Sequence, residues 1–152
     1  MNVLTYEIPG WGVGELYFRG KLVYHELPAS RKPSTPVVSD VPLVARIRAY
    51  FRGEQVSFED VELDLEWCTP FQLAVAEALR RVPYGETVTY GELAALAGSP
   101  NAQRAAGTFC AENRFPLVLP CHRVVSADGV GSYGSLGVAY KRRLLALENV
   151  PL

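Results

Sequence analysis

The sequence predicts an α+β fold in which a small antiparallel sheet comes first and helices follow. Short β-rich runs occupy the N-terminal part, helix-capping patterns dominate after residue 66, and the composition, 49% hydrophobic and 20% charged, is that of an ordinary globular protein. A chain of 152 residues is long enough for two small domains. We expect a supporting domain over residues 1–65 and a second domain over residues 66–152.

The first domain is expected to begin with a three-stranded antiparallel meander. Three runs rich in strand-forming residues are separated by short glycine-containing turns: residues 2–8, 13–18 and 21–27. Prolines and serines then mark residues 28–42 as a surface loop, and Pro42 opens a helix that ends at Gly53. Alternating apolar and acidic residues over 61–66 predict one further, half-buried strand.

The second domain is expected to be mostly helical. Thr69 caps a helix that ends before Pro83. A capping box that starts at Thr89 opens a short helix over residues 90–97, and a third helix follows over residues 101–112. Two short helices joined by a Gly-Ser turn have the spacing of a helix-turn-helix, and equally that of a plain helical hairpin in the core.

Charge and composition narrow the possible partners. The net charge is −1, so any contact with DNA must be local and only weakly dependent on salt. Three cysteines without a CxxC pair, and only two histidines, argue against a disulfide framework, a metal site or a metal cofactor. We see no apolar run of about 18 residues and no signal-peptide pattern. We therefore expect no membrane partner and a cytoplasmic, nucleoid-associated location.

The most informative stretch is the apolar segment that leads to Cys121. Pro120 holds Leu119 in an extended conformation, so an expected strand delivers the thiol at a defined point. His122 is a base for the thiol proton, and Arg123 adds positive potential. Because neighbouring residues of a strand point to opposite faces, we expect a water molecule between Cys121 and His122. On spacing alone, Cys121 is as compatible with an inert buried cysteine.

The segment Pro120-Cys-His-Arg-Val124 resembles the active-site signature of the O6-alkylguanine-DNA alkyltransferases. The surrounding motifs occur in the family's order and spacing over about residues 70–150: 84–94, 98–107, 112–113, 129–133 and 141–148. Residues 1–65 resemble the family only in layout. The resemblance implies a ribonuclease H-like N-terminal domain with an antiparallel sheet and a helical, winged helix-turn-helix-like C-terminal domain.

The resemblance also implies catalytic roles. Cys121 is the acceptor nucleophile and His122 the base that acts through water. Glu148 is expected to orient His122 and to stabilise its protonated form, although a glutamate so near a chain end is also compatible with a solvated charge. Asn113 is expected to hold the active-site turn, or else to cap a helix. Tyr90 is expected to donate a proton to the departing guanine, or else to be a half-buried aromatic residue.

Contacts with DNA are implied for the last of the three helices. Arg104 is expected to enter the base stack in place of the extruded nucleotide. The small residues Ala102, Ala105 and Gly107 let the helix lie close to the minor groove, and they would equally let helices pack tightly. We place Arg123 among the expected DNA contacts as well.

The expected substrate pocket departs from the family pattern at one loop. The family tyrosine, here Tyr133, is usually followed by a serine and glycines, whereas this sequence has Gly-Ser-Leu-Gly over 134–137. The pocket wall is therefore displaced or one residue longer at this point. We expect the pocket to be formed by Gly131, Tyr133, Ser135 and Pro116. The zinc ligands that some relatives carry in the N-terminal part are missing, so we expect no metal.

The expected function is DNA repair by a protein that works once and without a cofactor. A methyl or other alkyl group passes irreversibly from O6 of guanine, or O4 of thymine, in double-stranded DNA to Cys121 after base flipping. We expect a monomer. Two other classes fit parts of the sequence: a non-catalytic sensor of alkylated DNA, and a cysteine hydrolase. Sensors related to this family replace the cysteine, and a hydrolase turns over.

Overall fold

The computed structural model describes all 152 residues, which divide into two compact units. The first unit comprises Met1–Asp64 together with Arg114–Pro116, and the second comprises Leu65–Asn113 and Leu117–Leu152. We expected a boundary at residue 65. The contacts divide the chain one residue earlier and assign a short segment just before the active-site turn to the first unit.

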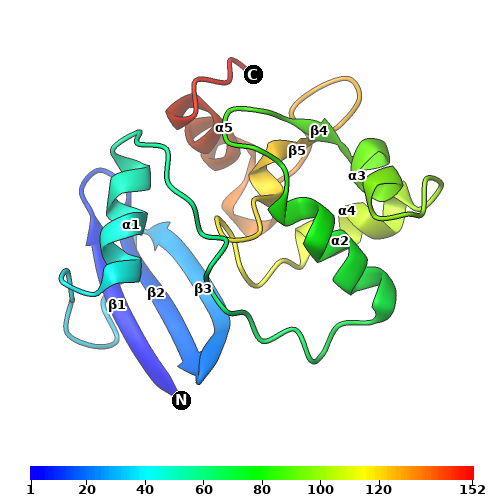
Figure 1. The fold of residues 1–152 in the computed structure, drawn as a ribbon. Coiled ribbons are helices and arrows are strands. Elements are labelled where there is room, and N and C mark those ends of the chain that lie inside the picture. The colour runs from blue at the N-terminus through cyan, green and yellow to red at the C-terminus, as the bar shows by residue number, and fades with distance from the viewer. The chain divides into compact units, whose positions relative to one another are not determined.

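The first unit contains the predicted antiparallel meander (Figure 1). Its strands, in the sheet order β1-β2-β3, are β1 (Asn2–Ile8), β2 (Gly12–Arg19) and β3 (Lys21–Ala29). Helix α1 (Pro42–Phe51) packs against β1 and buries Val44, Ile47 and Tyr50. The sheet and the helix therefore bury their apolar faces in one core, as expected for an amphipathic helix beside a meander.

The strand predicted over residues 61–66 does not form. Only one isolated bridge occurs there, between Leu22 and Leu63. Leu22 N–H donates to Glu62 O at 3.0 Å, and Asp64 N–H donates to Leu22 O at 2.9 Å. Val61 and Leu63 are buried as the alternation predicted, but they belong to an extended segment fixed at a single point of the sheet. Alternation indicates half-burial and does not require a ladder.

A buried imidazole connects β3 to the segment Arg114–Pro116 within this unit. His25 Nδ1 lies 3.0 Å from Pro116 O, His25 Nε2 lies 2.6 Å from Tyr6 Oη, and the His25 backbone N–H donates to Arg114 O at 2.9 Å. Burial lowers the pKa of His25 from 6.5 to about 4, against an opposing hydrogen bond to Pro116. With Nδ1–H donating and Nε2 accepting, the ring is neutral in the folded protein.

Because the His25 imidazole is buried in its neutral form, we expect the fold to lose stability in acid. The unfolded chain takes up a proton at His25 near pH 6.5 and the folded protein only near pH 4, so the stabilisation is fully present above 6.5 and is lost as the pH falls toward 4. We expect up to about 3 kcal/mol of the free energy of unfolding to be lost in this window. Denaturant titrations between pH 6.5 and 4 should show that the free energy of unfolding falls less steeply with pH in His25→Gln than in the unchanged protein. The same dependence on pH in both proteins would contradict the prediction.

The second unit contains the remaining elements. They are α2 (Pro70–Arg80), β4 (Val88–Thr89), α3 (Tyr90–Leu96), α4 (Gln103–Ala111), the 3₁₀ turn η1 (Cys121–Arg123), β5 (Val124–Val125), the 3₁₀ turn η2 (Gly134–Leu136) and α5 (Val138–Leu147). Thr69 and Thr89 each form a complete capping box, as predicted for Thr89. Helices α3 and α4 pack against each other (Figure 1). Strands β4 and β5 form a two-stranded parallel sheet.

Two expectations for this unit were wrong in detail. Helix α4 begins at Gln103, two residues later than predicted, because Ala102 N–H closes a turn onto Ser99 O at 2.9 Å. The apolar stretch before Cys121 is a series of turns and not a strand, and only β5 after the cysteine is extended. Helix α5 was not predicted. No helix of the structure combines the length and hydropathy needed to cross a bilayer.

Candidate active site

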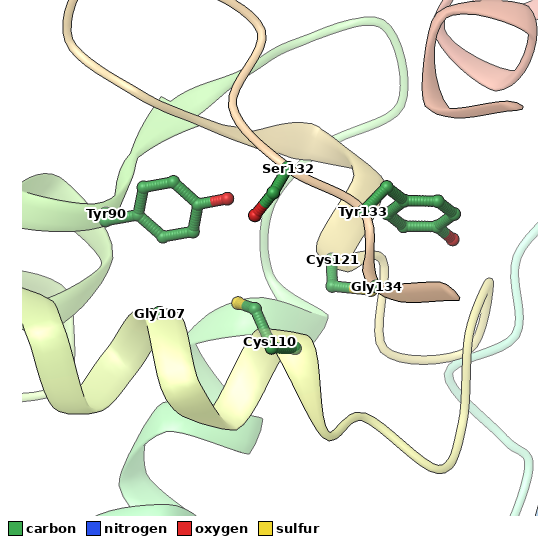
Figure 2. Close-up of a pocket in the computed structure, with 8 residues that line it drawn as sticks. Tyr90, Gly107, Cys110, Cys121, Ser132, Tyr133 and Gly134 are labelled. Carbon is green, nitrogen blue, oxygen red and sulfur yellow. The ribbon is translucent and has the colours of Figure 1, made fainter. Parts of the chain in front are cut away.

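Cys121 lies at the bottom of a small pocket of the second unit (Figure 2). The pocket is narrow and partly open to solvent. It is lined by residues from α3, α4, η1 and the segment up to the start of η2: Tyr90, Gly107, Cys110, Ala111, Cys121, Ser132, Tyr133 and Gly134. Cys121 is only 5% exposed. A reactant therefore has to enter the pocket to reach the sulfur.

The turn that presents Cys121 is fixed from several sides. Leu117 has a φ of 72°, a left-handed conformation that costs energy for a branched side chain and needs support from its surroundings. Asn113 Nδ2 donates to Leu119 O at 2.8 Å, and Cys121 N–H donates to the same carbonyl at 2.7 Å. Asn113 thus holds the turn through its side-chain amide, the role expected from the sequence.

The electrostatics of the pocket keep the thiol protonated at rest. Burial raises the pKa of Cys121; hydrogen bonding from Asn113 and Tyr133, and then the positive charge of Lys141, act in the opposite direction. The net shift is upward, so a base must remove the proton before the sulfur can attack. The pocket supplies donors and a cation that stabilise the thiolate once it forms.

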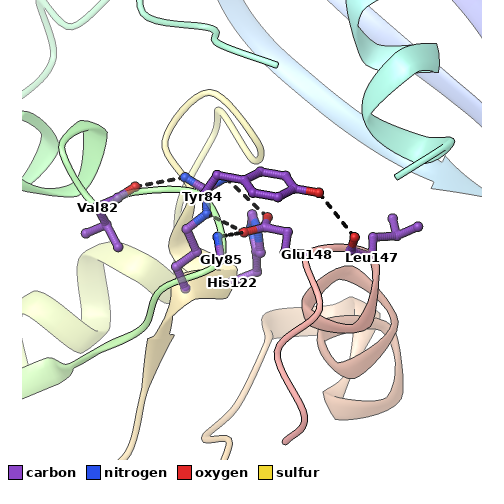
Figure 3. Close-up of polar contacts among 7 residues, drawn as sticks. Val82, Tyr84, Gly85, His122, Leu147 and Glu148 are labelled. Carbon is purple, nitrogen blue, oxygen red and sulfur yellow. Dashed lines mark hydrogen bonds and ion pairs between the residues drawn. The ribbon is translucent and has the colours of Figure 1, made fainter. Parts of the chain in front are cut away.

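That base is adjacent to the nucleophile and fully buried. His122 has no exposed surface, and its Nε2 lies 2.6 Å from Glu148 Oε2 (Figure 3). Burial lowers the pKa of His122, and the hydrogen bond and charge of Glu148 counteract this shift. The imidazole is therefore neutral at rest. With Nε2–H donating to the carboxylate, Nδ1 is the basic nitrogen.

Glu148 is the centre of a buried network (Figure 3). It caps α5 and is 3% exposed. Gly85 N–H and Arg123 Nε each donate to Oε1 at 2.9 Å, and Arg123 Nη2 donates to Oε2 at 3.2 Å. Burial alone would raise the pKa of Glu148, but the hydrogen bonds and charges of His122 and Arg123 lower it to about 2. The carboxylate is thus ionised whenever the protein is folded at neutral pH.

Arg123 does not have the position expected of a DNA contact. Its guanidinium is bidentate on Glu148, donates to Val82 O at 2.8 Å, and lies over the Tyr84 ring at 5.6 Å. Its side chain is only 11% exposed. The expectation is corrected: this arginine neutralises the buried carboxylate, and Tyr84 covers it while donating to Leu147 O at 3.1 Å.

Tyr90 faces Cys121 across the pocket from the first turn of α3 (Figure 2). Burial raises the pKa of its phenol, and the neighbouring thiols add to the shift. It therefore stays protonated and able to donate. Gly131, with a φ of +77°, makes room for it: a Cβ there would lie 3.0 Å from Tyr90 Oη and 3.2 Å from Ser126 N.

Of the four residues predicted for the substrate pocket, only Tyr133 lines it. Gly131 is not a lining residue, but a Cβ at this position would meet Tyr90. Ser135 is exposed in η2 and is not among the lining residues; Ser132, three residues earlier, is. Pro116 belongs to the first unit, where its carbonyl meets His25. The serine at the pocket is therefore Ser132 and not Ser135.

Helix α4 carries the predicted DNA-facing residues along its N-terminal half. Ala102 is the residue before the helix, and Arg104 and Ala105 in its first turn are exposed. Gly107 lines the pocket one turn further on, while Ala106 and Phe109 are buried in the core. Helix α4 thus contributes both the exposed Arg104 and, through Gly107, part of the wall of the pocket that holds Cys121.

Lys141 is a buried cation close to the pocket residues Ser132 and Tyr90, and it was not among the site residues expected from the sequence. It is fully buried on α5, and its Nζ donates to Val124 O at 2.5 Å and to Ser132 O at 3.0 Å. The ammonium lies 5.8 Å from the centre of the Tyr90 ring. Burial lowers the pKa of Lys141, and the charges of Cys121 and Cys110 act to raise it. A lysine in this sequence context is ordinarily exposed, so only the structure identifies it.

Known proteins are similar to this chain in sequence and in structure. Residues 70–150 match the family model described as 6-O-methylguanine DNA methyltransferase, DNA binding domain. A methylated-DNA–protein-cysteine methyltransferase of Mycobacterium tuberculosis is 48% identical over 106 residues, 69% of this chain and 62% of that protein. One of Methanothermobacter thermautotrophicus is 41% identical over 120 residues, 78% of this chain and 66% of that protein. The match thus spans somewhat less than two thirds of these relatives' length.

Solved structures extend the similarity over the full chain. Mycobacterium tuberculosis OGT, solved in complex with DNA, has a TM-score of 0.81 at 35% identity and covers 98% of this chain and 93% of its own. The O6-methylguanine-DNA methyltransferase of Pyrococcus kodakaraensis strain KOD1 has a TM-score of 0.77 at 27% identity, covering 98% and 100%. The α+β architecture with a small antiparallel sheet is common to them. On the family model and these relatives together, the chain belongs to the 6-O-methylguanine DNA methyltransferase family.

Proposed function

We propose that this protein repairs DNA by moving a methyl or other alkyl group from O6 of guanine onto Cys121, once per chain. The observation that carries the proposal is the buried thiol beside the His122–Glu148 pair, at the bottom of a pocket that also holds a protonated Tyr90. All these residues belong to one chain, so we expect a monomer that acts where its DNA is, in the cytoplasm.

Duplex DNA would bind along α4. A relative of the same fold has been solved in complex with DNA. Helices α3 and α4 form a helix-turn-helix pair, which we take as the core of a winged helix-turn-helix-like domain supported by a ribonuclease H-like unit. The exposed Arg104 enters the base stack, and the extruded guanine passes to the pocket beside Gly107. Extrusion costs a few kcal/mol, less for a weakened pair.

Transfer then begins with the removal of the thiol proton from Cys121. His122 Nδ1 takes the Cys121 proton through one water molecule, and Glu148 stabilises the imidazolium through the 2.6 Å contact at Nε2. The thiolate, stabilised by Asn113, Tyr133 and Lys141, attacks the alkyl carbon. The bond between that carbon and O6 breaks, and Tyr90 supplies the proton that lets guanine leave as a neutral base.

The product explains why one turnover is expected. A thioether has no carbonyl for water to attack, so neither His122 nor any other base in the pocket regenerates Cys121. This distinguishes the proposal from a cysteine hydrolase, which needs an acyl intermediate that water opens. It differs from a sensor of alkylated DNA in having the acceptor sulfur in place.

A stoichiometric experiment tests the proposal. Excess O6-methylguanine duplex should add one methyl mass per chain, on the peptide that contains Cys121, and a second addition of duplex should add nothing. Cys121→Ala should gain no mass and still bind the duplex. Methyl groups on Cys68 or Cys110, or repeated turnover, would contradict the assignment.

The role of Arg104 has its own expected result. Arg104→Ala should slow transfer from duplex DNA by about tenfold, because the guanidinium no longer fills the gap left by the extruded base. Transfer from free O6-benzylguanine should change little, since that substrate needs no flipping. The exposed Arg142 on α5 provides a matched control, Arg142→Ala. Equal losses on both substrates would count against a role in extrusion.

A further inference from the structure

The pocket holds a second thiol that the proposed mechanism does not use. Cys110 on α4 is half-buried and lines the pocket together with Cys121. Figure 2 shows its sulfur pointing from the helix to the side of the pocket where Tyr90 and Ser132 lie. Cys68, the third cysteine, is not among the lining residues. Nothing in the sequence places Cys110 near Cys121, and only the fold brings the two residues to one pocket.

Both sulfurs belong to one electrostatic environment. The charge of Cys121 acts on the pKa of Cys110, and both thiols act on the pKa values of Lys141 and Tyr90. Burial first, and then the Cys121 charge, raise the pKa of Cys110. Burial thus keeps both thiols protonated at rest, but the base of the His122–Glu148 pair is next to Cys121 in the chain and not to Cys110. The first alkyl transfer goes to Cys121.

We propose that Cys110 captures the second electrophilic carbon of bifunctional lesions, so that O6-(2-haloethyl)guanine ends as an ethylene bridge between the sulfurs of Cys121 and Cys110. The inference rests on the proposed alkyl transfer to Cys121. It adds a second residue that is modified, and a defined fate for lesions that carry a leaving group two carbons from O6.

The chemistry balances without an oxidant or a reductant. Cys121 first takes the haloethyl carbon, and guanine leaves as a neutral base. The thioether sulfur then displaces the halide from the neighbouring carbon and forms a three-membered episulfonium ring. Cys110 Sγ attacks a ring carbon, the strained carbon–sulfur bond opens to restore the Cys121 thioether, and the Cys110 proton passes to water. The net products are neutral guanine, a halide ion, a proton and the bridged protein.

The pocket favours capture by Cys110 over the competing reactions. An episulfonium ion exposed to solvent would react with water or with a nucleophilic atom of the DNA. The second reaction would cross-link the protein to the DNA. A thiol that lines the same small pocket is presented to the ring at a high effective concentration.

The test uses the full chain and a duplex with one O6-(2-chloroethyl)guanine. Peptide mapping should find the Cys110 and Cys121 peptides joined by an ethylene unit, with no chlorine retained. Cys110→Ser, which keeps the size but replaces the thiol with a poorer nucleophile, should instead give 2-hydroxyethyl-Cys121 and several-fold more protein–DNA cross-link. Cys68→Ser should behave as the unchanged protein. Cys110→Ala should repeat the result of Cys110→Ser, which guards against misfolding of either variant.

Parallel reactions separate the two proposals. With O6-methylguanine duplex the unchanged protein should carry one methyl group on Cys121; its absence would overturn the proposed function itself. Normal methylation together with 2-hydroxyethyl-Cys121 and an unmodified Cys110 would overturn only the bridge. Equal cross-linking by the unchanged protein and Cys110→Ser would overturn it too.

Discussion

Replacing Glu148 with glutamine should slow alkyl transfer to Cys121 by about 10³-fold while leaving the affinity for undamaged duplex nearly unchanged. The carboxylate accepts from His122 Nε2 at 2.6 Å, which leaves Nδ1 as the basic nitrogen. A glutamine amide that donates to Nε2 would favour the other tautomer, with the proton on Nδ1, where it cannot accept the proton of the thiol. The imidazolium would also lose its counter-charge. Single-turnover rates with labelled duplex measure the effect.

The pH dependence of that rate distinguishes a lost base from a distorted fold. With its base intact, the protein should react at a rate that changes little from neutral to mildly alkaline pH, because the lowered pKa of His122 keeps the ring neutral there. In Glu148→Gln the thiolate has to form without help, and since burial raises the pKa of Cys121 the rate should climb steadily with pH. Arg123→Gln, which weakens the network but keeps the His122–Glu148 contact, is the matched control. A parallel pH profile for Glu148→Gln would contradict the tautomer argument.

Local signals predicted the parts of the fold that depend on a few neighbouring residues. The capping box at Thr89 needs only four consecutive residues, and the start of α3 was correct. The meander depends on short turns and was likewise correct. The strand expected over residues 61–66 failed because a ladder requires a partner along its whole length, and Leu22 offers only one bridge.

The candidate site was predictable where a motif covers it and not elsewhere. The motif predicted that Cys121 and His122 act together, but the contacts that a residue makes with distant parts of the chain cannot be predicted from its neighbours in sequence. Arg123 was expected at DNA because an arginine beside a nucleophile suggests positive potential, whereas its guanidinium is bidentate on Glu148. Cys110 lines the pocket from α4, and Lys141 on α5 donates to the carbonyl of the pocket residue Ser132. Nothing near either residue in the sequence indicates these contacts.

These long-range contacts resolve an apparent conflict in the pocket. Burial holds Cys121 protonated, which protects a sulfur that is spent after one reaction, yet the same burial opposes formation of the thiolate. In the proposed mechanism, His122 removes the thiol proton when the substrate is bound. Hydrogen bonds from Asn113 and Tyr133, and then the positive charge of Lys141, lower the pKa of Cys121 and so stabilise the anion that the base creates.

Lys141→Met should therefore slow transfer by about 10- to 100-fold at neutral pH, because removing the cation raises the pKa of Cys121. Methionine keeps much of the apolar stem but removes the charge and leaves Val124 O and Ser132 O without the ammonium that donates to them. The direction of the shift fixes the recovery: because removing a cation raises the pKa of the thiol, the rate of Lys141→Met should approach that of the unchanged protein as the pH rises.

Two variants of α5 separate charge from packing in this result. Lys141→Arg keeps the charge and should retain more activity than Lys141→Met at neutral pH, while Arg142→Met, on an exposed neighbour, should have no effect on the rate. A loss in Lys141→Met that is equal at all pH values would point to distortion of the loop at Ser132 instead of a higher pKa for Cys121. A recovery with pH would place the cation in the reaction itself, as the group that lets a deeply buried sulfur ionise when the lesion arrives.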